Sequence, residues 1–338
     1  MKPFAIAVAL LFALCFAGCV SSDIGVLDLK SGRMVHPSHS GVRQIVVSIN
    51  REKGTFTTLV RDDGRLVMRT FDKQCNRLSE CTLPLFTTSY CDTSGFAFSD
   101  NLQNLAYATG QAADLILIDV SSGRQVVLQK RFVESGGELP LVKWIGNSTL
   151  LTALREYPDT SRAINEIALF DIASRRMKAI YNPIYLSSFD YALSHDQTKL
   201  AFFEGNAKHD IYGTIKIINL ENGVGEVRLG DGKHLIHAPS WSPDDSELAY
   251  VEGTNLKIWS RTNNVTRTIV TFPEDFICSN VVFGEGVVAY SGSRNQMPIR
   301  PLVILDSKTG REIRRVSALF NGGIFLVDKH TVVCELGY

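Results

Sequence analysis

The chain has 338 residues, of which 45% are hydrophobic and 21% charged, and its formal net charge is zero. This composition is typical of a well-packed globular protein, and the balanced charge gives no electrostatic case for nucleic acid or an anionic membrane surface as a partner. The sequence contains no G-x-S-x-G elbow, H-E-x-x-H zinc motif, phosphate-binding loop or dinucleotide fingerprint, so these common catalytic motifs are excluded.

The first element in chain order has the pattern of an export signal. Lys2 precedes an uninterrupted apolar run from Phe4 to Phe16, and small residues follow before Cys19. The run is too short for a membrane span, so we expect residues 1–18 to be a removable signal peptide. Its removal takes away Lys2 and leaves 34 basic and 35 acidic residues, a formal charge of −1.

The segment Phe16-Ala17-Gly18-Cys19 resembles the bacterial lipobox, whose cysteine receives diacylglycerol and becomes the mature N-terminus. An ordinary secretory signal with an incidental cysteine is the alternative. Val20 stands where an Asp would indicate retention in the inner membrane. The resemblance therefore implies a lipoprotein of the cell envelope, anchored through Cys19 to the outer membrane, facing the periplasm and otherwise soluble.

Seven copies of one β-hairpin pattern follow along the chain. Each has an apolar strand, a turn that opens with a short polar residue able to accept backbone hydrogen bonds, and a second strand. The turns open at Asp28, Asp72, Asp119, Asp171, Asn219, Ser260 and Asp306. Four residues later, six copies have a residue type that tolerates the left-handed conformation of a hairpin bulge, and Arg175 is the exception. The six are Gly32, Asn76, Gly123, Gly223, Asn264 and Gly310.

The hairpins recur every 41 to 52 residues, which is the length of one four-stranded propeller blade. Each hairpin is expected to supply the two outer strands of a blade and to follow an inner pair of strands. Three inner pairs share a turn that contains Ser-x-Asp or Ser-x-Asn, at 98–107, 193–202 and 241–250. Weaker copies lie at 45–61, 143–153, 281–291 and 323–335.

The two ends of the chain complete each other. The inner pair at 323–335 has no hairpin after it, and the hairpin at Asp28 has no inner pair before it. We therefore predict an all-β fold with one domain over residues 19–338. It is a β-propeller of seven blades, or six if residues 45–71 are irregular, closed by N-terminal strands that pair with C-terminal ones.

The stretch WSPDDSELAY, 241–250, resembles the WSPDG-x-x-I-A-F signature of the TolB-type, WD-like propeller repeats, and FSDNLQNLAY and LSHDQTKLAF are degenerate copies. The resemblance covers the mature chain as architecture and implies an interaction module of the cell envelope. The paired carboxylates Asp244 and Asp245 are interpreted as a turn cap and its solvated neighbour. Trp241 and Tyr250 are interpreted as packing between blades.

Function is expected on the face opposite the tight turns, where loops join the blades and the second strand to the third. We call it the long-loop face, with its irregular segments at 155–165, 204–214, 230–240 and 292–301. It carries residue types that are typical of interfaces, so the leading hypothesis is a module that binds a protein or glycan. The candidates are Arg155, Tyr157, Arg162, His209, Asp210, Tyr212, His234, His237, Arg294 and Arg300. A solvated face without a partner is the alternative.

A metal site is the second hypothesis, because His234-x-x-His237 with His209 and Asp210 could supply imidazole and carboxylate ligands. Positions i and i+3 of an extended segment point to opposite sides, so the two histidines converge only if the chain bends between them. Oligogalacturonate lyases use a similar propeller with a histidine-held metal, which makes a metal-dependent lyase or hydrolase the competing function. The leading reading is a protein that is not an enzyme and uses no cofactor.

Five cysteines remain after Cys15 is lost with the signal and Cys19 is assigned to lipid: Cys75, Cys81, Cys91, Cys278 and Cys334. Five is an odd number, so at least one thiol stays unpaired within the chain. Three of them fall between positions 75 and 91, and a disulfide within that group is predicted, with its pairing left open.

Overall fold

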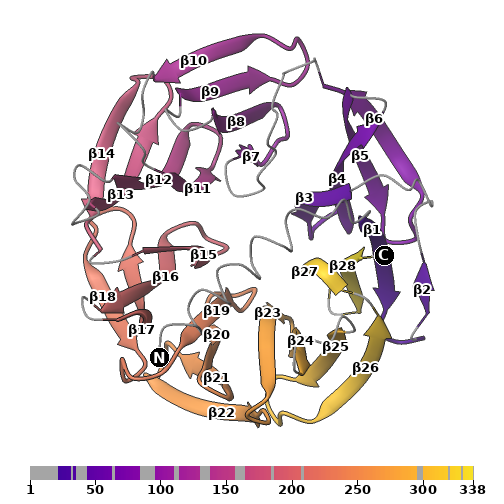
Figure 1. Cartoon of the computed structure of the whole chain (residues 1–338). Coiled ribbons are helices and arrows are strands. Elements are labelled where there is room, and N and C mark those ends of the chain that lie inside the picture. Colours follow the sequence, from indigo (N-terminus) through magenta and orange to yellow (C-terminus); the bar gives the residue numbers. More distant parts are fainter. Residues whose placement is uncertain are drawn as a thin grey trace, which may run out of the picture.

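The computed structural model forms a closed ring of seven four-stranded antiparallel sheets, shown along the ring axis in Figure 1. Blades 1 to 6 contain β3–β6, β7–β10, β11–β14, β15–β18, β19–β22 and β23–β26, and blade 7 contains β27, β28, β1 and β2. The structure describes residues 22–337 except 32, 36–43, 63–64, 84–95, 110–113, 130–137, 157–163, 184–185, 207–208, 295–299, 319 and 329. The prediction of seven blades is confirmed.

Each blade runs from an inner strand beside the ring axis to an outer strand at the periphery. Blades 1 to 3 contain β3 (Gln44–Asn50), β4 (Thr55–Asp62), β5 (Arg65–Asp72), β6 (Arg77–Thr82), β7 (Phe96–Phe98), β8 (Asn104–Thr109), β9 (Asp114–Asp119), β10 (Gln125–Gln129), β11 (Glu138–Ile145), β12 (Thr149–Glu156), β13 (Ile164–Asp171) and β14 (Arg176–Tyr181). Blades 4 to 6 contain β15 (Leu186–Leu193), β16 (Lys199–Asn206), β17 (His209–Asn219), β18 (Gly225–Leu229), β19 (Ile236–Trp241), β20 (Glu247–Glu252), β21 (Asn255–Ser260), β22 (Val265–Thr271), β23 (Phe276–Gly284), β24 (Val287–Arg294), β25 (Arg300–Asp306) and β26 (Glu312–Ala318). Blade 7 contains β27 (Phe320–Asp328), β28 (Thr331–Gly337), β1 (Ser22–Asp28) and β2 (Met34–Val35).

The repeated hairpins are the two outer strands of each blade, as predicted. In six copies the first turn side chain accepts a backbone N–H at 2.7 to 2.9 Å, for example Asp119 from Ser122 and Asp306 from Thr309. Arg175 adopts the left-handed conformation, with φ of 55°, although its residue type does not favour it. Blade 1 differs from the prediction: Cys75, not Asn76, has the positive φ, because its turn is one residue shorter.

The ring is closed by antiparallel pairing between β1 and β28. Their register runs over seven residue pairs, from Ser22↔Gly337 to Asp28↔Thr331, and the Leu29 N–H donates to the His330 carbonyl at 2.7 Å just beyond it. The first and last strands of the ring therefore lie in one sheet, as the incomplete repeats at the two ends predicted.

The hydrophobic core is divided among the seven seams between neighbouring blades. Each of seven buried apolar clusters draws its side chains from two adjacent blades. In β20, Leu248 and Tyr250 face the seam with blade 4, while Ala249 and Val251 face the seam with blade 6. Because a central strand is buried on both faces, its sequence is continuously apolar and does not alternate.

Trp241 and Tyr250 both pack in the seam between blades 4 and 5, which confirms their interpretation as packing residues. The Trp241 indole N–H also donates to the Ala192 carbonyl of blade 4 at 3.1 Å. Trp144 makes the matching bond to Ala97 two seams earlier in the ring, at 2.8 Å from blade 3 to blade 2. Aromatic residues at the end of an inner strand thus join neighbouring blades by packing and by a hydrogen bond.

The structure tests the predicted disulfide only for Cys75 and Cys81. Cys75 and Cys81 are not bonded to each other, and Cys91 lies outside the described residues, so a bridge that involves Cys91 stays a prediction. Burial raises the pKa of the Cys278 and Cys334 thiols to about 12, which makes them packing residues without reactivity. Among the described residues, no helix has the length and apolar character to cross a membrane.

Candidate functional site

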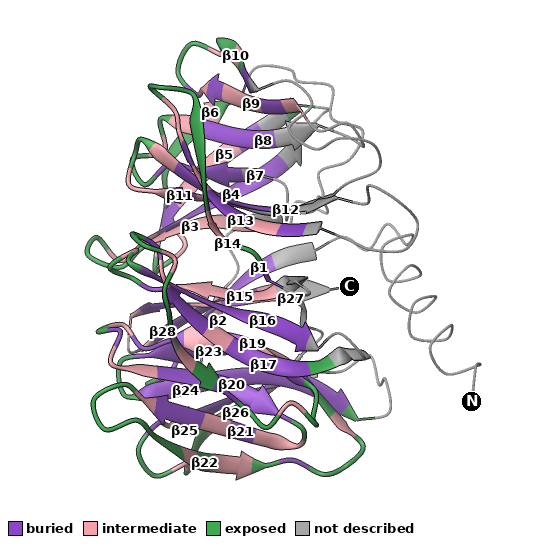
Figure 2. Ribbon diagram, turned by 90° about the vertical axis from the view of Figure 1, so that its left-hand side faces the viewer, coloured by how far each residue is buried: buried purple, intermediate pink, exposed green. Residues whose placement is uncertain are grey.

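The two faces of the ring differ in construction. Figure 2 views the ring edge-on, with the tight turns, many of them exposed, on the left-hand side. These turns join the first strand of each blade to the second and the third to the fourth, and we call this side the tight-turn face. The long-loop face lies opposite, and its described parts include residues 230–235, 253–254 and 272–275.

Asp244 lies on the tight-turn face and caps the turn between β19 and β20. Its Oδ1 accepts the hydroxyls of Ser242 at 2.7 Å and Ser246 at 2.8 Å, and the Ser246 N–H at 3.2 Å. The two hydroxyl bonds hold the pKa of Asp244 below its ordinary value. The predicted role of Asp244 as a turn cap is confirmed.

Asp245 is not the solvated neighbour that the sequence suggested. Only 6% of it is exposed, and it adopts a φ of 57°. Its Oδ2 accepts the Asp196 N–H at 2.8 Å, and its Oδ1 accepts the His195 N–H at 2.8 Å and lies 3.0 Å from the His195 Nδ1. The prediction was wrong because the partners of Asp245 come from the equivalent turn of blade 4, about 50 residues earlier.

The same blade 4 turn contacts the opposite side of the ring. His195 Nε2 lies 2.7 Å from Arg51 Nη1, in the inner turn of blade 1. Because arginine can only donate, Nε2 is the acceptor and Nδ1 carries the proton given to Asp245. Gln197 links two more inner turns, accepting the Gly146 N–H at 2.6 Å and donating to Asp100 Oδ2 at 3.0 Å. The charged groups here are engaged in holding the turns together.

The candidate binding residues that the structure describes lie at the long-loop ends of strands or, for His234, in the loop between two strands. For Arg155, His209, Asp210 and Arg300 the structure describes the backbone, in β12, β17, β17 and β25. Tyr157 and Arg162 lie outside the described residues. Tyr212, His234, His237 and Arg294 are described with their side chains.

His237 lies apart from His234, on inner strand β19 near Asp190 of β15. Burial lowers the pKa of His237, and the Asp190 carboxylate opposes that change. Asp190 also accepts the Ala238 N–H at 3.0 Å, which ties β15 to β19. Among the described side chains, His237 belongs to no group of three possible metal ligands.

His234 instead groups with two carboxylates that the sequence analysis did not select. Its Nδ1 lies 3.1 Å from each oxygen of Asp231, and the Asp231 N–H donates to Glu252 Oε1 at 3.0 Å. The Lys233 N–H, and then His234, lower the pKa of Asp231, which keeps it ionised. Lys257 forms an ion pair with Glu252. The signal that could have identified Asp231 is Gly230-Asp231-Gly232, a bend three residues before His234.

Exposed apolar side chains are distributed unevenly over the surface. Three of them lie at the long-loop ends of consecutive blades: Tyr212 in blade 4 (36% exposed), Leu235 before blade 5 (47%) and Ile277 in blade 6 (57%). The others of this kind in the described chain lie along the outer hairpins, one to a blade: Leu78, Val127, Met177, Val224, Val265 and Ile313. The long-loop face of blades 4 to 6 thus combines exposed apolar groups with the His234 cluster.

The blade 6 part of this surface rests on an aromatic cluster. The rings of Phe272, Phe276 and Tyr290 have centroids 4.8 to 6.1 Å apart. A Cβ on Gly292 would lie 2.3 Å from the Ile277 carbonyl oxygen and 2.6 Å from the Phe276 ring, so only glycine permits this approach. Ile277 follows Phe276 in β23, and Arg294 of β24 is the register partner of Phe276. At the surface, Arg294 Nε lies 3.9 Å from Asp275 Oδ1.

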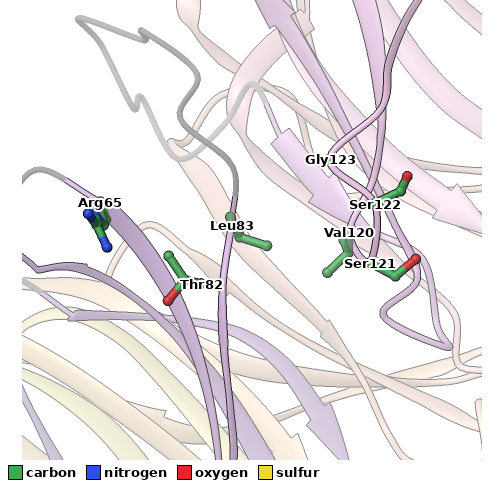
Figure 3. A pocket seen from close by; sticks show the side chains of 7 residues that line it. All are labelled: Arg65, Thr82, Leu83, Val120, Ser121, Ser122 and Gly123. Atoms are coloured by element: carbon green, nitrogen blue, oxygen red, sulfur yellow. The ribbon is translucent and has the colours of Figure 1, made fainter.

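A separate cavity of about 330 Å³ lies between blades 1 and 2, lined by Arg65, Thr82, Leu83, Val120, Ser121, Ser122 and Gly123 (Figure 3). The hydroxyls of Ser121 and Ser122 both donate to Asp119, at 2.7 and 2.8 Å, to form its turn. They are thus committed to the hairpin, and the cavity contains no candidate from the sequence analysis.

The fold is shared with solved propellers of different activities. An oligogalacturonate lyase in complex with manganese matches with a TM-score of 0.63 at 14% identity, over 94% of this chain and 96% of that one. A putative TolB from Agrobacterium tumefaciens matches with a TM-score of 0.54 at 9% identity, over 95% and 99% of the two chains. This chain has the TolB-type propeller fold.

An oligogalacturonate lyase from Vibrio parahaemolyticus also resembles this TolB-type propeller, with a TM-score of 0.57 at 14% identity over 88% and 85% of the two chains. No model of a protein family matches the sequence, and no curated protein does. At these identities the likeness establishes the fold and leaves the activity open.

Proposed function

We propose that this propeller is a binding module of the cell envelope that holds a protein partner on the long-loop face of blades 4 to 6. The observation that supports it is the exposure of Tyr212, Leu235 and Ile277 at the same end of three consecutive blades. Exposed apolar side chains at one end of neighbouring elements are a common mark of an interaction surface.

The surroundings of these side chains have the composition of an interface. Arg294 and His234, with more than half of each side chain exposed, add polar groups among the apolar ones. Protein interfaces combine an apolar centre with polar residues around it. Leu235 and Ile277 favour a protein over a glycan, because the hydroxyl-covered surface of a sugar offers little apolar area to bury against an aliphatic side chain.

The test compares two matched double variants of the full chain, each expressed in cells beside the wild type. The long-loop variant, Leu235→Ser with Ile277→Ser, changes two side chains of the proposed surface that are 47% and 57% exposed. The outer-strand variant, Ile313→Ser with Leu78→Ser, changes two side chains elsewhere that are 46% and 57% exposed. Each is cross-linked in intact envelopes and its bound proteins are identified. We expect a protein captured by the wild type and by the outer-strand variant to be lost from the long-loop variant.

Equal capture by both variants would contradict the proposal, provided that all three proteins melt at the same temperature. The wild type and the outer-strand variant could instead bind oligosaccharides from the envelope that the long-loop variant does not bind. That result would show that the partner of this surface is a glycan and would overturn the proposal of a protein.

A metal-dependent lyase acting on acidic glycans is the second candidate. It is supported by the grouping of His234 with Asp231 and Glu252, and by the likeness of fold to a lyase that was solved with manganese. Incubation of the mature protein with oligogalacturonate and Mn²⁺, followed at the ultraviolet absorbance of an unsaturated product, tests this function. Product formed by the wild type and lost in His234→Ala would favour the lyase over the binding module.

The position in the envelope is a proposal of the same kind. The lipobox resemblance supports attachment of diacylglycerol to Cys19, which would tether the propeller to the outer membrane on its periplasmic side. Labelling of cells with a palmitate analogue should mark the wild-type protein and leave Cys19→Ala unmarked. Equal labelling of both would contradict the anchor.

A further inference from the structure

One loop on the long-loop face brings together three side chains that can ligate a metal. Residues 230–235 join β18 to β19 and contain Asp231 and His234, and Glu252 ends β20 beside them. Ligand atoms of the three residues all lie within 4.8 Å of one another. The loop is fixed to the β20–β21 turn by the Gly253 N–H, which donates to the Leu235 carbonyl at 2.8 Å.

The three groups differ in burial in a way that suits a site open on one side. The Glu252 side chain is 9% exposed and forms the floor, whereas the side chains of Asp231 and His234 are 46% and 58% exposed and form the walls. A cation above Glu252 would therefore have protein ligands on one side and water on the other.

We propose that Asp231, His234 and Glu252 form a site for one divalent cation of the zinc class, and that Lys257 competes with it for Glu252. This site goes beyond the proposed protein docking and does not depend on it. Imidazole nitrogen with two carboxylate oxygens is a donor set suited to zinc, with a fourth position left for water. Calcium is disfavoured because it takes six to eight oxygen ligands.

The distances require a modest closure of the site. Zinc binds nitrogen and oxygen ligands at about 2.0–2.2 Å, so two ligands of one tetrahedral ion lie about 3.5 Å apart. His234 Nδ1 and the Asp231 oxygens are already 3.1 Å apart. Glu252 has to approach by about 1 Å, and rotation of the exposed Asp231 and His234 side chains can supply that movement.

Lys257 determines how strongly the cation is held. Its ammonium pairs with Glu252 Oε2, so an incoming ion has to displace a positive charge that already neutralises the carboxylate. Removal of this ammonium should therefore raise the affinity for the metal. This expectation distinguishes a metal site from an ordinary ion pair. If Glu252 and Lys257 formed only an ion pair, removal of the ammonium would break that pair without any gain in metal affinity.

Blade 4 offers a matched control. Glu204 occupies the position of Glu252 one blade earlier and is also buried, with 3% of its side chain exposed against 9% for Glu252. It accepts the Tyr181 hydroxyl at 2.9 Å and lies 3.3 Å from Arg228 Nη2. Glu204→Gln thus removes a buried carboxylate of the same type without touching the proposed site.

The test is calorimetric titration of the purified mature protein with Zn²⁺, and with Ca²⁺ as the cation expected to fail. We expect one equivalent of Zn²⁺ to bind, about tenfold or more weakly in His234→Ala and in Asp231→Asn. Binding should be about tenfold tighter in Lys257→Met and unchanged in Glu204→Gln. Melting temperatures establish that each variant is folded, and Lys257→Gln replaces Lys257→Met if the latter is not.

Absence of saturable Zn²⁺ binding would overturn the site. So would binding that is unchanged in His234→Ala, or lost in Glu204→Gln and kept in Asp231→Asn. Failure here leaves the docking proposal standing, because its test changes Leu235 and Ile277 and measures a different partner.

Discussion

The two faces of the ring use the same residue types in different roles. On the tight-turn face, Asp245 and His195 are bonded to each other and to further groups of blades 4 and 1, and Asp245 is 6% exposed. On the long-loop face, Asp231 and His234 are also bonded to each other, yet about half of each side chain is exposed. An Asp–His pair is structural where it joins blades and available to a ligand where it lies within one loop.

The largest effect should come from a seam residue beneath the tight-turn face. Trp241→Ala removes a side chain that is 2% exposed and its bond to Ala192, so we expect a loss of about 3–5 kcal/mol in the free energy of unfolding. Urea denaturation of the variant and the wild type measures the loss. A change below 1 kcal/mol would mean that Trp241 does not pack as a seam residue.

Substitutions of the two adjacent carboxylates, Asp244 and Asp245, should differ clearly in their effect on the free energy of unfolding. Asp245→Ala leaves the backbone N–H groups of His195 and Asp196 without their acceptor, and we expect a loss of about 2–4 kcal/mol. Asp244→Ala removes a local turn cap and should cost about 1 kcal/mol. Chemical denaturation ranks the two, with Asp245→Asn as a control that keeps the left-handed backbone acceptable. The reverse order would restore the reading of Asp245 as a solvated residue.

Acid should weaken the tight-turn face. Hydroxyl bonds first, then backbone N–H bonds, lower the pKa of Asp119, Asp171 and Asp306, that of Asp119 to about 2. A carboxylate with a lowered folded pKa stabilises the fold above its unfolded pKa of about 3.9 and loses that effect as the pH falls through its folded pKa. Melting temperatures should therefore fall between about pH 4 and pH 2, and less steeply in Asp119→Asn. An equal slope in that variant would contradict the assignment.

The smallest change in stability is expected on the long-loop face. Asp231→Ala breaks contacts of an exposed loop side chain, so the free energy of unfolding should change less than in any of the variants above. Thermal unfolding alongside Asp245→Ala gives the direct comparison of the two faces. A loss as large as that of Asp245→Ala would show that Asp231 holds the fold together.

The fold could be predicted because it depends on short patterns that repeat. An Asp that opens a turn and a Gly four residues later make a hairpin without help from distant residues, as Asp119 and Gly123 do. The shorter turn of blade 1 was missed, because Cys75 does not indicate a left-handed conformation by its residue type.

The site was harder to predict because its contacts are not periodic. The partners of Asp245 lie in another blade, and no local pattern contains them. The sequence motif His234-x-x-His237 joined two histidines that the structure separates, since His237 lies near Asp190 and His234 near Asp231. Glu252 was missed because it ends a buried strand, where a carboxylate gives no signal of the loop that folds over it.

The pairing of β1 with β28 has a consequence for how the molecule is made. Gly25 and Cys334 meet across that junction although they are 309 positions apart, so the first strand waits for nearly the whole chain before its neighbour exists. Until then it is a bare edge of backbone donors and acceptors, the kind of surface on which chains aggregate. Closure is also a contact of very high sequence separation, which slows folding. The nascent chain is thus most prone to aggregation just before the ring closes.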